Sequence, residues 1–199
     1  MQNFKFVYNY YICNSTLLVA ENHKAASTSI AKAILKKYYP SLYAGMQSNP
    51  TITFRDYHNR APKTDSCIGK DVVTVIRDPI DRFVSLVSFM NLSSSIDTIL
   101  DQLMDLNDPK NIPEFQTIHG HAALNHIFHP QIEIGKEANK VSYFKYPDGL
   151  EDFCKAIWID APLEELNVSN KIKPILTDDQ IEKLSIIYNK DLELYDSLS

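Results

Sequence analysis

The most informative segment of the chain is Asp71-Val72-Val73-Thr74-Val75-Ile76, which Arg77, Asp78 and Pro79 follow directly. The six residues are mostly β-branched or apolar at successive positions, which is typical of a central parallel strand buried on both faces. Asp78 is a favourable N-cap, and Pro79 is a favourable first residue of a helix. The segment therefore predicts a strand that passes directly into a helix over residues 79–90.

The same order of strand, polar loop and helix occurs earlier in the chain. Residues 16–20 form a short apolar run, as in a buried strand, and the polar loop 21–29 follows. Apolar residues then recur with helical period over residues 30–38, and Pro40 is expected to end that helix. The composition of residues 39–50, rich in Pro, Ser and Asn, predicts a loop.

Strands and helices alternate along the rest of the chain. We expect strands at 51–54 and 141–144, a charged nonperiodic segment at 55–62, and helices at 96–106, 148–158 and 177–195. This alternation predicts an α/β fold with a central, mainly parallel sheet flanked by helices. A length of 199 residues suits one domain, over residues 1–199.

Composition excludes several classes of protein and site. The five glycines form neither G-x-G-x-x-G nor a Walker loop, which argues against the usual dinucleotide and ATP sites. A net charge of −5 argues against a nucleic-acid partner. The three cysteines have no paired spacing, and no run resembles a signal peptide or membrane span. We therefore expect a cytoplasmic protein without a membrane partner.

Two strand-to-helix loops carry residues that suit anions, since ligands of such sheets bind beyond the carboxyl ends of the strands. The first loop is Lys24-Ala25-Ala26-Ser27-Thr28-Ser29, a lysine and three hydroxyls at a helix N-terminus. The second loop has Arg77 directly after the strand, and Ser85 lies about two turns into the helix that follows. The forked guanidinium group of Arg77 and the hydroxyl of Ser85 suit a phosphate monoester. The alternatives are a helix cap beside a solvated lysine, and an ion pair of Arg77 with Asp78 or Asp81.

Taken together, the two loops resemble the cofactor signatures of the sulfotransferase family. Residues 24–29 resemble its 5′-phosphosulfate loop, and residues 75–85 resemble its 3′-phosphate motif almost throughout. His129-Pro130-Gln131 and residues 187–195 resemble weaker elements of the carbohydrate-type, sulfotransferase family 2-like branch. Two departures are His23, where relatives often have proline, and the absence of glycine from the first loop.

The resemblance implies a P-loop-NTPase-like three-layer fold. It also implies transfer of a sulfuryl group from 3′-phosphoadenosine 5′-phosphosulfate (PAPS) to an acceptor hydroxyl, expected on a carbohydrate or related small molecule. The spent nucleotide would be 3′-phosphoadenosine 5′-phosphate (PAP). By the same resemblance, Lys24 would stabilise the leaving phosphate, and Ala25, Ala26, Ser27, Thr28 and Ser29 would surround the 5′-phosphosulfate. Arg77 and Ser85 would bind the 3′-phosphate.

An acceptor hydroxyl must lose a proton, and histidine suits that task. Relatives often place the base between the two cofactor motifs, where His58 is the only histidine, and Asp56 is a candidate to orient it. A solvated His58 is the alternative, with His119, His121 and His129 as other candidate bases. The clustering of His119, His121 and His129 could indicate a metal site, but it has no matching Cys or carboxylate spacing, so we expect no metal.

Two other functions stay open. One is a nucleotide kinase or NTPase of the related P-loop architecture, which would need Mg²⁺ and usually a glycine-rich loop. The other is a noncatalytic nucleotide-binding protein. Loops on a shared scaffold set specificity, so the acceptor's identity is open, as is the oligomeric state.

Overall fold

The computed structural model describes residues 8–107, 128–164 and 172–198. The chain forms two compact units, which we call the sheet unit and the helical unit. Among the described residues, the sheet unit consists of 8–77, 133–164 and 198, and the helical unit consists of 78–107, 128–132 and 172–197. The single domain expected over residues 1–199 stays a prediction.

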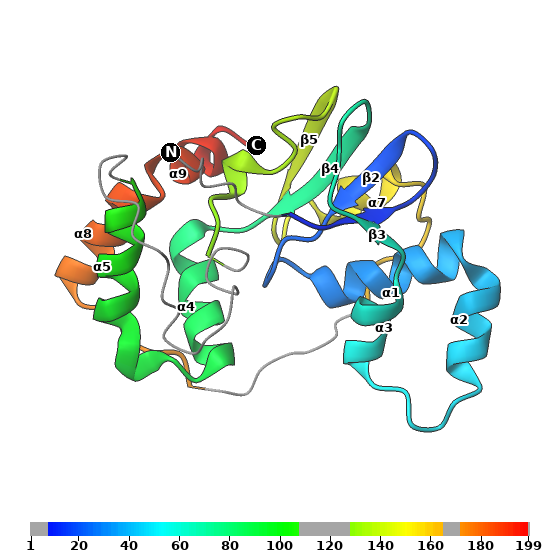
Figure 1. Ribbon diagram of the computed structural model, residues 1–199, viewed down its shortest axis with the longest axis horizontal. Helices are drawn as coiled ribbons and strands as arrows, with labels where there is room; N and C mark the ends of the chain where they lie inside the picture. The colour runs from blue at the N-terminus through cyan, green and yellow to red at the C-terminus, as the bar shows by residue number, and fades with distance from the viewer. Residues whose placement is uncertain (1–7, 108–127, 165–171, 199) are drawn as a thin grey trace. The chain divides into compact units, whose positions relative to one another are not determined.

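Five strands form the sheet, in the order β3-β1-β2-β4-β5 (Figure 1). Their bounds are Tyr10–Ile12 (β1), Leu17–Ala20 (β2), Lys63–Thr64 (β3), Asp71–Ile76 (β4) and Lys140–Lys145 (β5). β4 pairs in parallel with both β2 and β5, whereas β1 pairs antiparallel with β2 and β3. The expected α/β class is therefore confirmed as a mixed five-stranded sheet flanked by helices.

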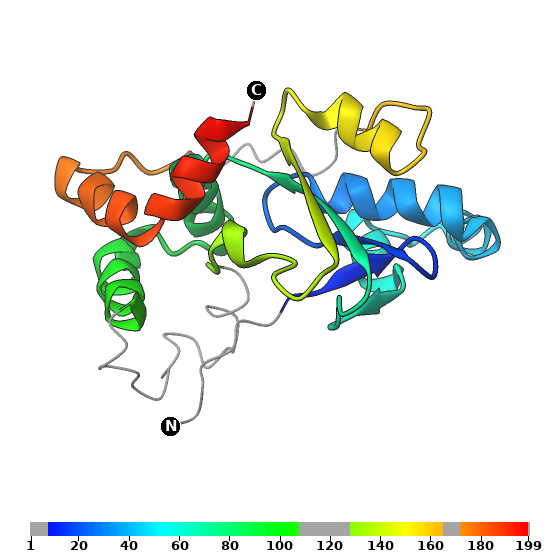
Figure 2. The ribbon, with the colours of Figure 1, turned by 90° about the horizontal axis from the view of Figure 1, so that it is seen from above.

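Residues of β4 pack in two different hydrophobic clusters. Val73 and Val75 of β4 pack in one cluster with residues of α1 (Ser27–Tyr38), α3 (Phe54–Arg60) and α7 (Leu150–Ala156). Val72 belongs to a second cluster, with Ile134. Figure 2 shows α1 and α7 on the same side of the sheet. β4 is thus covered on both faces, as its sequence predicts.

Two helices occupy the region where a loop and a strand were expected. α2 spans Pro40–Gln47, so the loop predicted at 39–50 is wrong in that part. Pro40 is the first residue of α2, where its missing N–H is tolerated. α3 spans Phe54–Arg60, so the strand predicted at 51–54 and the nonperiodic segment at 55–62 are also wrong.

A capping box explains the start of α3. The backbone N–H of Thr53 donates to Asp56 Oδ2 at 2.7 Å, and the Thr53 side chain accepts from the N3 backbone. This reciprocal pair satisfies two donors that would otherwise lack a partner at a helix start. The capping residues therefore override the β-propensity of the short run before them.

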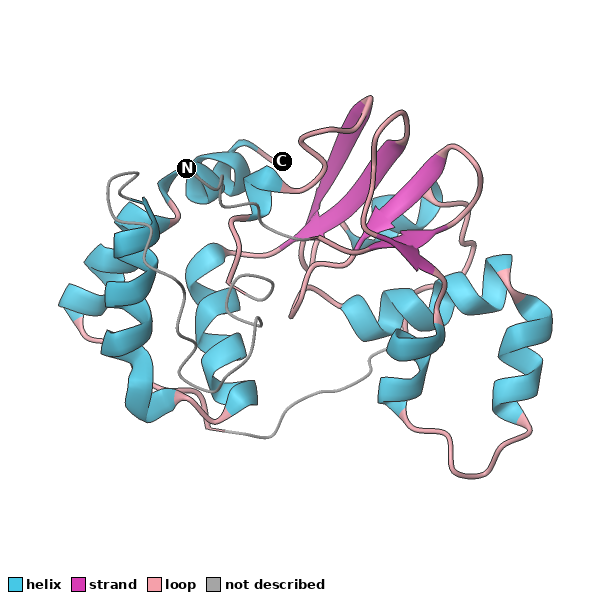
Figure 3. Cartoon of the chain, in the orientation of Figure 1, coloured by secondary structure: helices cyan, strands magenta, loops and turns pink. Residues whose placement is uncertain are grey.

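The helical unit contains four α-helices in its described residues (Figure 3). They are α4 (Pro79–Met90), α5 (Ile96–Asn107), α8 (Asp178–Ile187) and α9 (Asn189–Ser197). Two short 3-10 helices, η1 (Ser93–Ser95) and η2 (Gln131–Glu133), also occur in the chain. The Asp78 side chain accepts from Asp81 N at 2.8 Å, which confirms the predicted cap of α4.

The C-terminal region forms two helices where one was predicted over residues 177–195. Thr177 and Gln180 form the expected capping box of α8. At Tyr188 the backbone leaves helical geometry (φ −109°, ψ 24°), and the Tyr188 hydroxyl donates to the carbonyl of Phe128 at 2.7 Å. Asp191 of α9 accepts from the backbone N–H of Gln131 at 2.6 Å. These buried bonds hold the break in place.

Within residues 8–107, 128–164 and 172–198, no single helix is long and apolar enough to span a bilayer. The pair Pro79–Met90 and Ser93–Met104, bent by 119°, meets the length and composition criteria only when its two helices are taken together.

Gly149 provides a test of the packing around α7. A Cβ atom at Gly149 would lie 2.8 Å from Lys145 N and 2.9 Å from Lys145 O, so the backbone would have to shift. We expect Gly149→Ala to lower the free energy of unfolding by about 2 kcal/mol in urea denaturation, as for other overpacked sites. Gly45→Ala is the control, because a Cβ there meets nothing within 4 Å. Equal losses in the two variants would contradict this packing.

Candidate functional site

The loop between β2 and α1 is held in an unusual backbone conformation. Lys24 and Ala26 both have positive φ, at 64° and 60°, although neither is glycine. Left-handed geometry costs an ordinary residue about 1–2 kcal/mol. Ala25 between them is fully buried. Strain of this kind persists only where the surroundings enforce it, and it is concentrated at functional sites.

The three hydroxyl residues form the first turn of α1. Ala26 is the N-cap, and its methyl side chain cannot accept a hydrogen bond from the helix; Ser27, Thr28 and Ser29 take positions N1 to N3. The first turn contains no acidic residue. A helix start of this kind combines backbone N–H groups, hydroxyls and the positive end of the helix dipole. It therefore suits an anion, and the alternative of a Ser or Thr N-cap does not apply.

Arg77 joins the second loop to the first. β2 and β4 pair with Leu17 opposite Asp71 and Val19 opposite Val73, so both strands end at the same edge of the sheet. From that edge, Arg77 Nη1 donates to the carbonyl oxygen of Lys24 at 3.0 Å. The guanidinium also lies 5.3 Å from the centre of the Tyr146 ring, as a cation–π contact. The two predicted motifs are thus in direct contact within the sheet unit.

Ser85 is not part of this contact. It lies half-buried on α4, which belongs to the helical unit. Its predicted role with Arg77 at a 3′-phosphate stays a prediction. Asp81, the other residue considered as an ion-pair partner, lies 2.8 Å from Lys173 Nζ within the helical unit.

His58 lies on α3, and both of its ring nitrogens are engaged. Nε2 lies 2.5 Å from Glu21 Oε1, and Nδ1 lies 2.9 Å from the hydroxyl of Tyr11. In a neutral ring, Nε2–H donates to the carboxylate and Nδ1 accepts from the tyrosine. Asp56 was the expected orienting residue, but it caps α3 instead, and Glu21 takes that role.

Glu21 is a buried carboxylate at the end of β2. Its side chain is only 1% exposed, and Lys63 Nζ lies 2.7 Å from Oε2. Burial by itself would raise the pKa of Glu21. The hydrogen bond and charge of His58, the charge of His23 and the hydrogen bond of Lys63 outweigh that effect and lower the pKa to about 2. Glu21 is therefore an ionised group at neutral pH, and it ties β2 to α3 and β3.

The contacts of Tyr11 link His58 to the start of α1, beside the loop of residues 24–29. The Tyr11 hydroxyl lies 3.5 Å from the carbonyl oxygen of Ser27, the first residue of α1. Burial, followed by the charge of Glu21, raises the pKa of Tyr11 well above its usual value, so the phenol stays protonated. With Nε2–H bonded to Glu21, His58 can accept a proton from a substrate only at Nδ1, after Tyr11 moves away from that nitrogen.

One set of side chains among the described residues has the composition of a metal site. The ligand atoms of Glu21, His23 and His58 all lie within 4.8 Å of one another. The other histidines considered from the sequence are not in this set. His119 and His121 lie outside the described residues, and His129 is buried, with its carbonyl accepting from Arg82.

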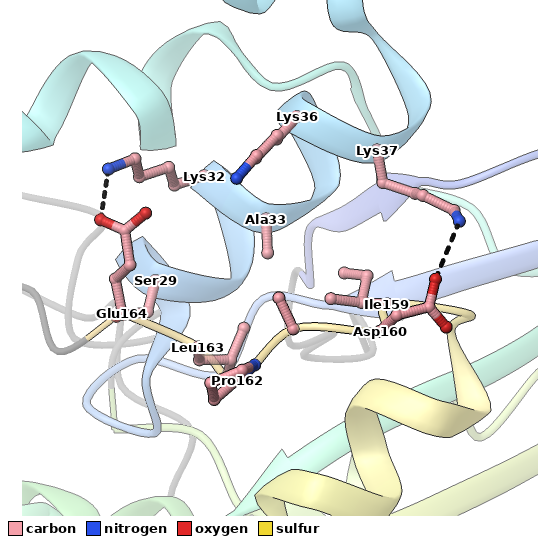
Figure 4. Close-up of a pocket in the computed structure, with 11 residues that line it drawn as sticks. Ser29, Lys32, Ala33, Lys36, Lys37, Ile159, Asp160, Pro162, Leu163 and Glu164 are labelled. Carbon is pink, nitrogen blue, oxygen red and sulfur yellow. Dashed lines mark hydrogen bonds and ion pairs between the residues drawn. The ribbon is translucent and has the colours of Figure 1, made fainter.

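A cavity of about 350 Å³ lies between α1 and residues 159–164 (Figure 4). Ser29, Lys32 and Lys36 line it on the helix side, and residues 159–164 line the opposite side. Lys32 pairs with Glu164 at 2.5 Å across this space. Ser29 belongs both to the cavity and to the first turn of α1, so the cavity begins beside the candidate anion site.

Comparison with protein-family models, with curated proteins and with solved structures finds no match to this chain. The interpretation of the site therefore depends on the motifs and on their geometry.

Sequence reasoning missed the partners of His58 and Arg77. Glu21 is a charged residue directly after a buried strand, and that position is a usable signal of a site at the strand end. Tyr11, Lys63 and Tyr146 reach the site from β1, β3 and the segment after β5. These positions depend on strand order, and no local pattern indicates them.

Ala26 tests whether the loop is strained. Glycine adopts positive φ without steric cost, so we expect Ala26→Gly to raise the free energy of unfolding by up to about 1 kcal/mol in urea. Ala25→Gly is the matched control and should be destabilising, because Ala25 is fully buried and has no positive φ. A loss of stability in Ala26→Gly as large as that in Ala25→Gly would show that the loop is not held as described.

Proposed function

We propose that the protein is a sulfotransferase that moves a sulfuryl group from PAPS to an acceptor hydroxyl, with a carbohydrate as the expected acceptor class. The observation that carries the proposal is the hydrogen bond from Arg77 to the carbonyl oxygen of Lys24, at 3.0 Å. Lys24 and Arg77 lie 53 residues apart, in two motifs that separately resemble the two cofactor signatures of one family. Their contact supports a common ligand with phosphate groups at two positions.

The first loop supplies what the leaving group requires. As the acceptor oxygen bonds to sulfur, the bond from sulfur to the 5′-phosphate oxygen breaks, and negative charge collects on the departing PAP. Lys24 and the first turn of α1 stabilise that charge where it develops. Ser27, Thr28 and Ser29 add hydroxyl donors that hold the transferring group in line. No step of this transfer requires a metal.

The proton of the acceptor hydroxyl passes to His58 in this proposal. The ionised carboxylate of Glu21 then stabilises the resulting imidazolium, and Lys63 holds the other oxygen of that carboxylate. For His58 to accept the proton at Nδ1, the acceptor hydroxyl must displace Tyr11 from that nitrogen, while Nε2–H keeps its bond to Glu21. The cavity beside Ser29 has a volume within the range of small-molecule sites, which supports an acceptor larger than water.

The three-layer P-loop-like architecture and the cytoplasmic location belong to the same proposal. A kinase or NTPase would instead hydrolyse or transfer phosphate from ATP with Mg²⁺. A noncatalytic protein would bind PAP and transfer nothing to any acceptor. Incubation with PAPS and a panel of sugars, and separately with ATP and Mg²⁺, distinguishes the three functions by the product formed.

Lys24 and Arg77 provide the test of nucleotide binding. We expect Lys24→Ala and Arg77→Ala each to weaken PAP binding about 10–100-fold in calorimetry, because each removes a charge-assisted bond to phosphate. Lys140→Ala and Arg60→Ala are the controls, since both side chains are exposed and lie outside the two loops and the cavity. Equal affinity in all four variants and the wild type would contradict the site.

His58 provides a separate test of the chemical step. We expect His58→Ala to reduce sulfuryl transfer at least 100-fold while PAP affinity changes less than about threefold, because general bases contribute 10²–10⁴-fold. The measurement is transfer of labelled sulfate from PAPS, beside calorimetry with PAP. Unchanged transfer would assign proton removal to another group.

A further inference from the structure

Three potential metal ligands meet at the end of β2. Glu21 and His23 are two residues apart in the segment after the strand, and His58 comes from α3. The Nε2 atoms of both histidines approach the same carboxylate oxygen, Oε1 of Glu21, at 2.5 Å for His58 and 3.7 Å for His23. The two imidazole rings are 5.9 Å apart between centroids. Three ligand atoms on two separate segments thus point to one small volume.

The groups around these ligands hold them in the orientation that a metal requires. Tyr11 engages Nδ1 of His58, which leaves Nε2 as the nitrogen directed at the cluster. Lys63 engages Oε2 of Glu21, which leaves Oε1. Outer contacts of this kind fix the ring orientation of metal-binding histidines and usually change affinity 10–100-fold when removed. The carboxylate is buried, while the two histidines are 20% and 21% exposed, so an ion can enter from solvent.

We propose that Glu21, His23 and His58 form a binding site for one divalent transition-metal cation of the Zn²⁺ class. A set of two imidazoles and one carboxylate binds Zn²⁺, Co²⁺ and Ni²⁺ in preference to Mg²⁺ or Ca²⁺. Bond lengths of about 2.0–2.1 Å in a tetrahedral site place ligand atoms about 3.3 Å apart. Nε2 of His58 is closer to Oε1 than this, at 2.5 Å, and Nε2 of His23 is farther away, at 3.7 Å. A shift of His58 by less than about 1 Å therefore makes room for the ion.

The site differs from a strong structural zinc site in its charge. Lys63 already balances the charge of Glu21, so a bound divalent ion adds uncompensated positive charge. We therefore expect a Kd on the order of micromolar. With a metal on Nε2, the neutral ring of His58 carries its proton on Nδ1 and has no nitrogen left to accept another, so the metal is expected to inhibit the proposed sulfuryl transfer and not to assist it. Metal binding itself does not depend on that transfer.

The test is a titration of the full-length, chelator-treated protein with Co²⁺ and Zn²⁺ in the absence of nucleotide. We expect one equivalent of Co²⁺ to give visible d–d absorption that Zn²⁺ abolishes. His23→Ala, which removes a partly exposed ligand, should weaken binding at least tenfold with an unchanged circular dichroism spectrum. His58→Ala should do the same. Glu164→Gln, an exposed carboxylate outside the cluster, is the control and should bind as the wild type does.

Three outcomes would overturn the proposal. They are the absence of saturable binding up to millimolar metal, equal affinity in His23→Ala and the wild type, and a cobalt–thiolate charge-transfer band that assigns the ion to Cys13, Cys67 or Cys154. Because no nucleotide is present, any of these results leaves the proposed transfer unaffected. Failure of PAP binding, in turn, leaves the metal site unaffected.

Discussion

The parallel pairing of β2 with β4 is the constraint on which the whole site depends. It ends both strands at one edge of the sheet, so that the loop before α1 and Arg77 emerge side by side. Asn22 strengthens this junction, because its side chain donates to the carbonyl of Val75 at 2.8 Å inside the core. Arg77 completes it from the other strand by its bond to Lys24. The cross-strand bonds thus hold a loop conformation that its own residues do not favour.

The low glycine content of the chain has a direct structural counterpart in that loop. A phosphate-binding turn requires left-handed backbone, and glycine usually supplies it without strain. Here Lys24 and Ala26 adopt it at some cost, and the surrounding contacts offset that cost. The absence of a glycine-rich motif therefore does not remove the capacity for an anion site, but it makes the site dependent on tertiary contacts.

Much of the scaffold could be predicted from local patterns. The β-branched run of β4 and the capping residues Asp78 and Pro79 carry their own signals, and the structure follows them. The capping box of Thr53 and Asp56 was also present in the sequence, but the β-propensity of the residues before it led to the wrong assignment of α3. The partners of His58 could not be predicted, because Tyr11 and Glu21 meet it only through the pairing of β1 with β2 and the packing of α3.

A crystal structure of the protein with PAP tests the proposed nucleotide site most directly. We expect the 5′-phosphate at the first turn of α1, within about 2.7–3.2 Å of Lys24 Nζ and of backbone N–H groups of residues 27–29. We also expect the bond between Arg77 and the Lys24 carbonyl to be retained or to pass to the nucleotide. PAP bound at another surface, with the first turn of α1 in contact with solvent alone, would rule out this site.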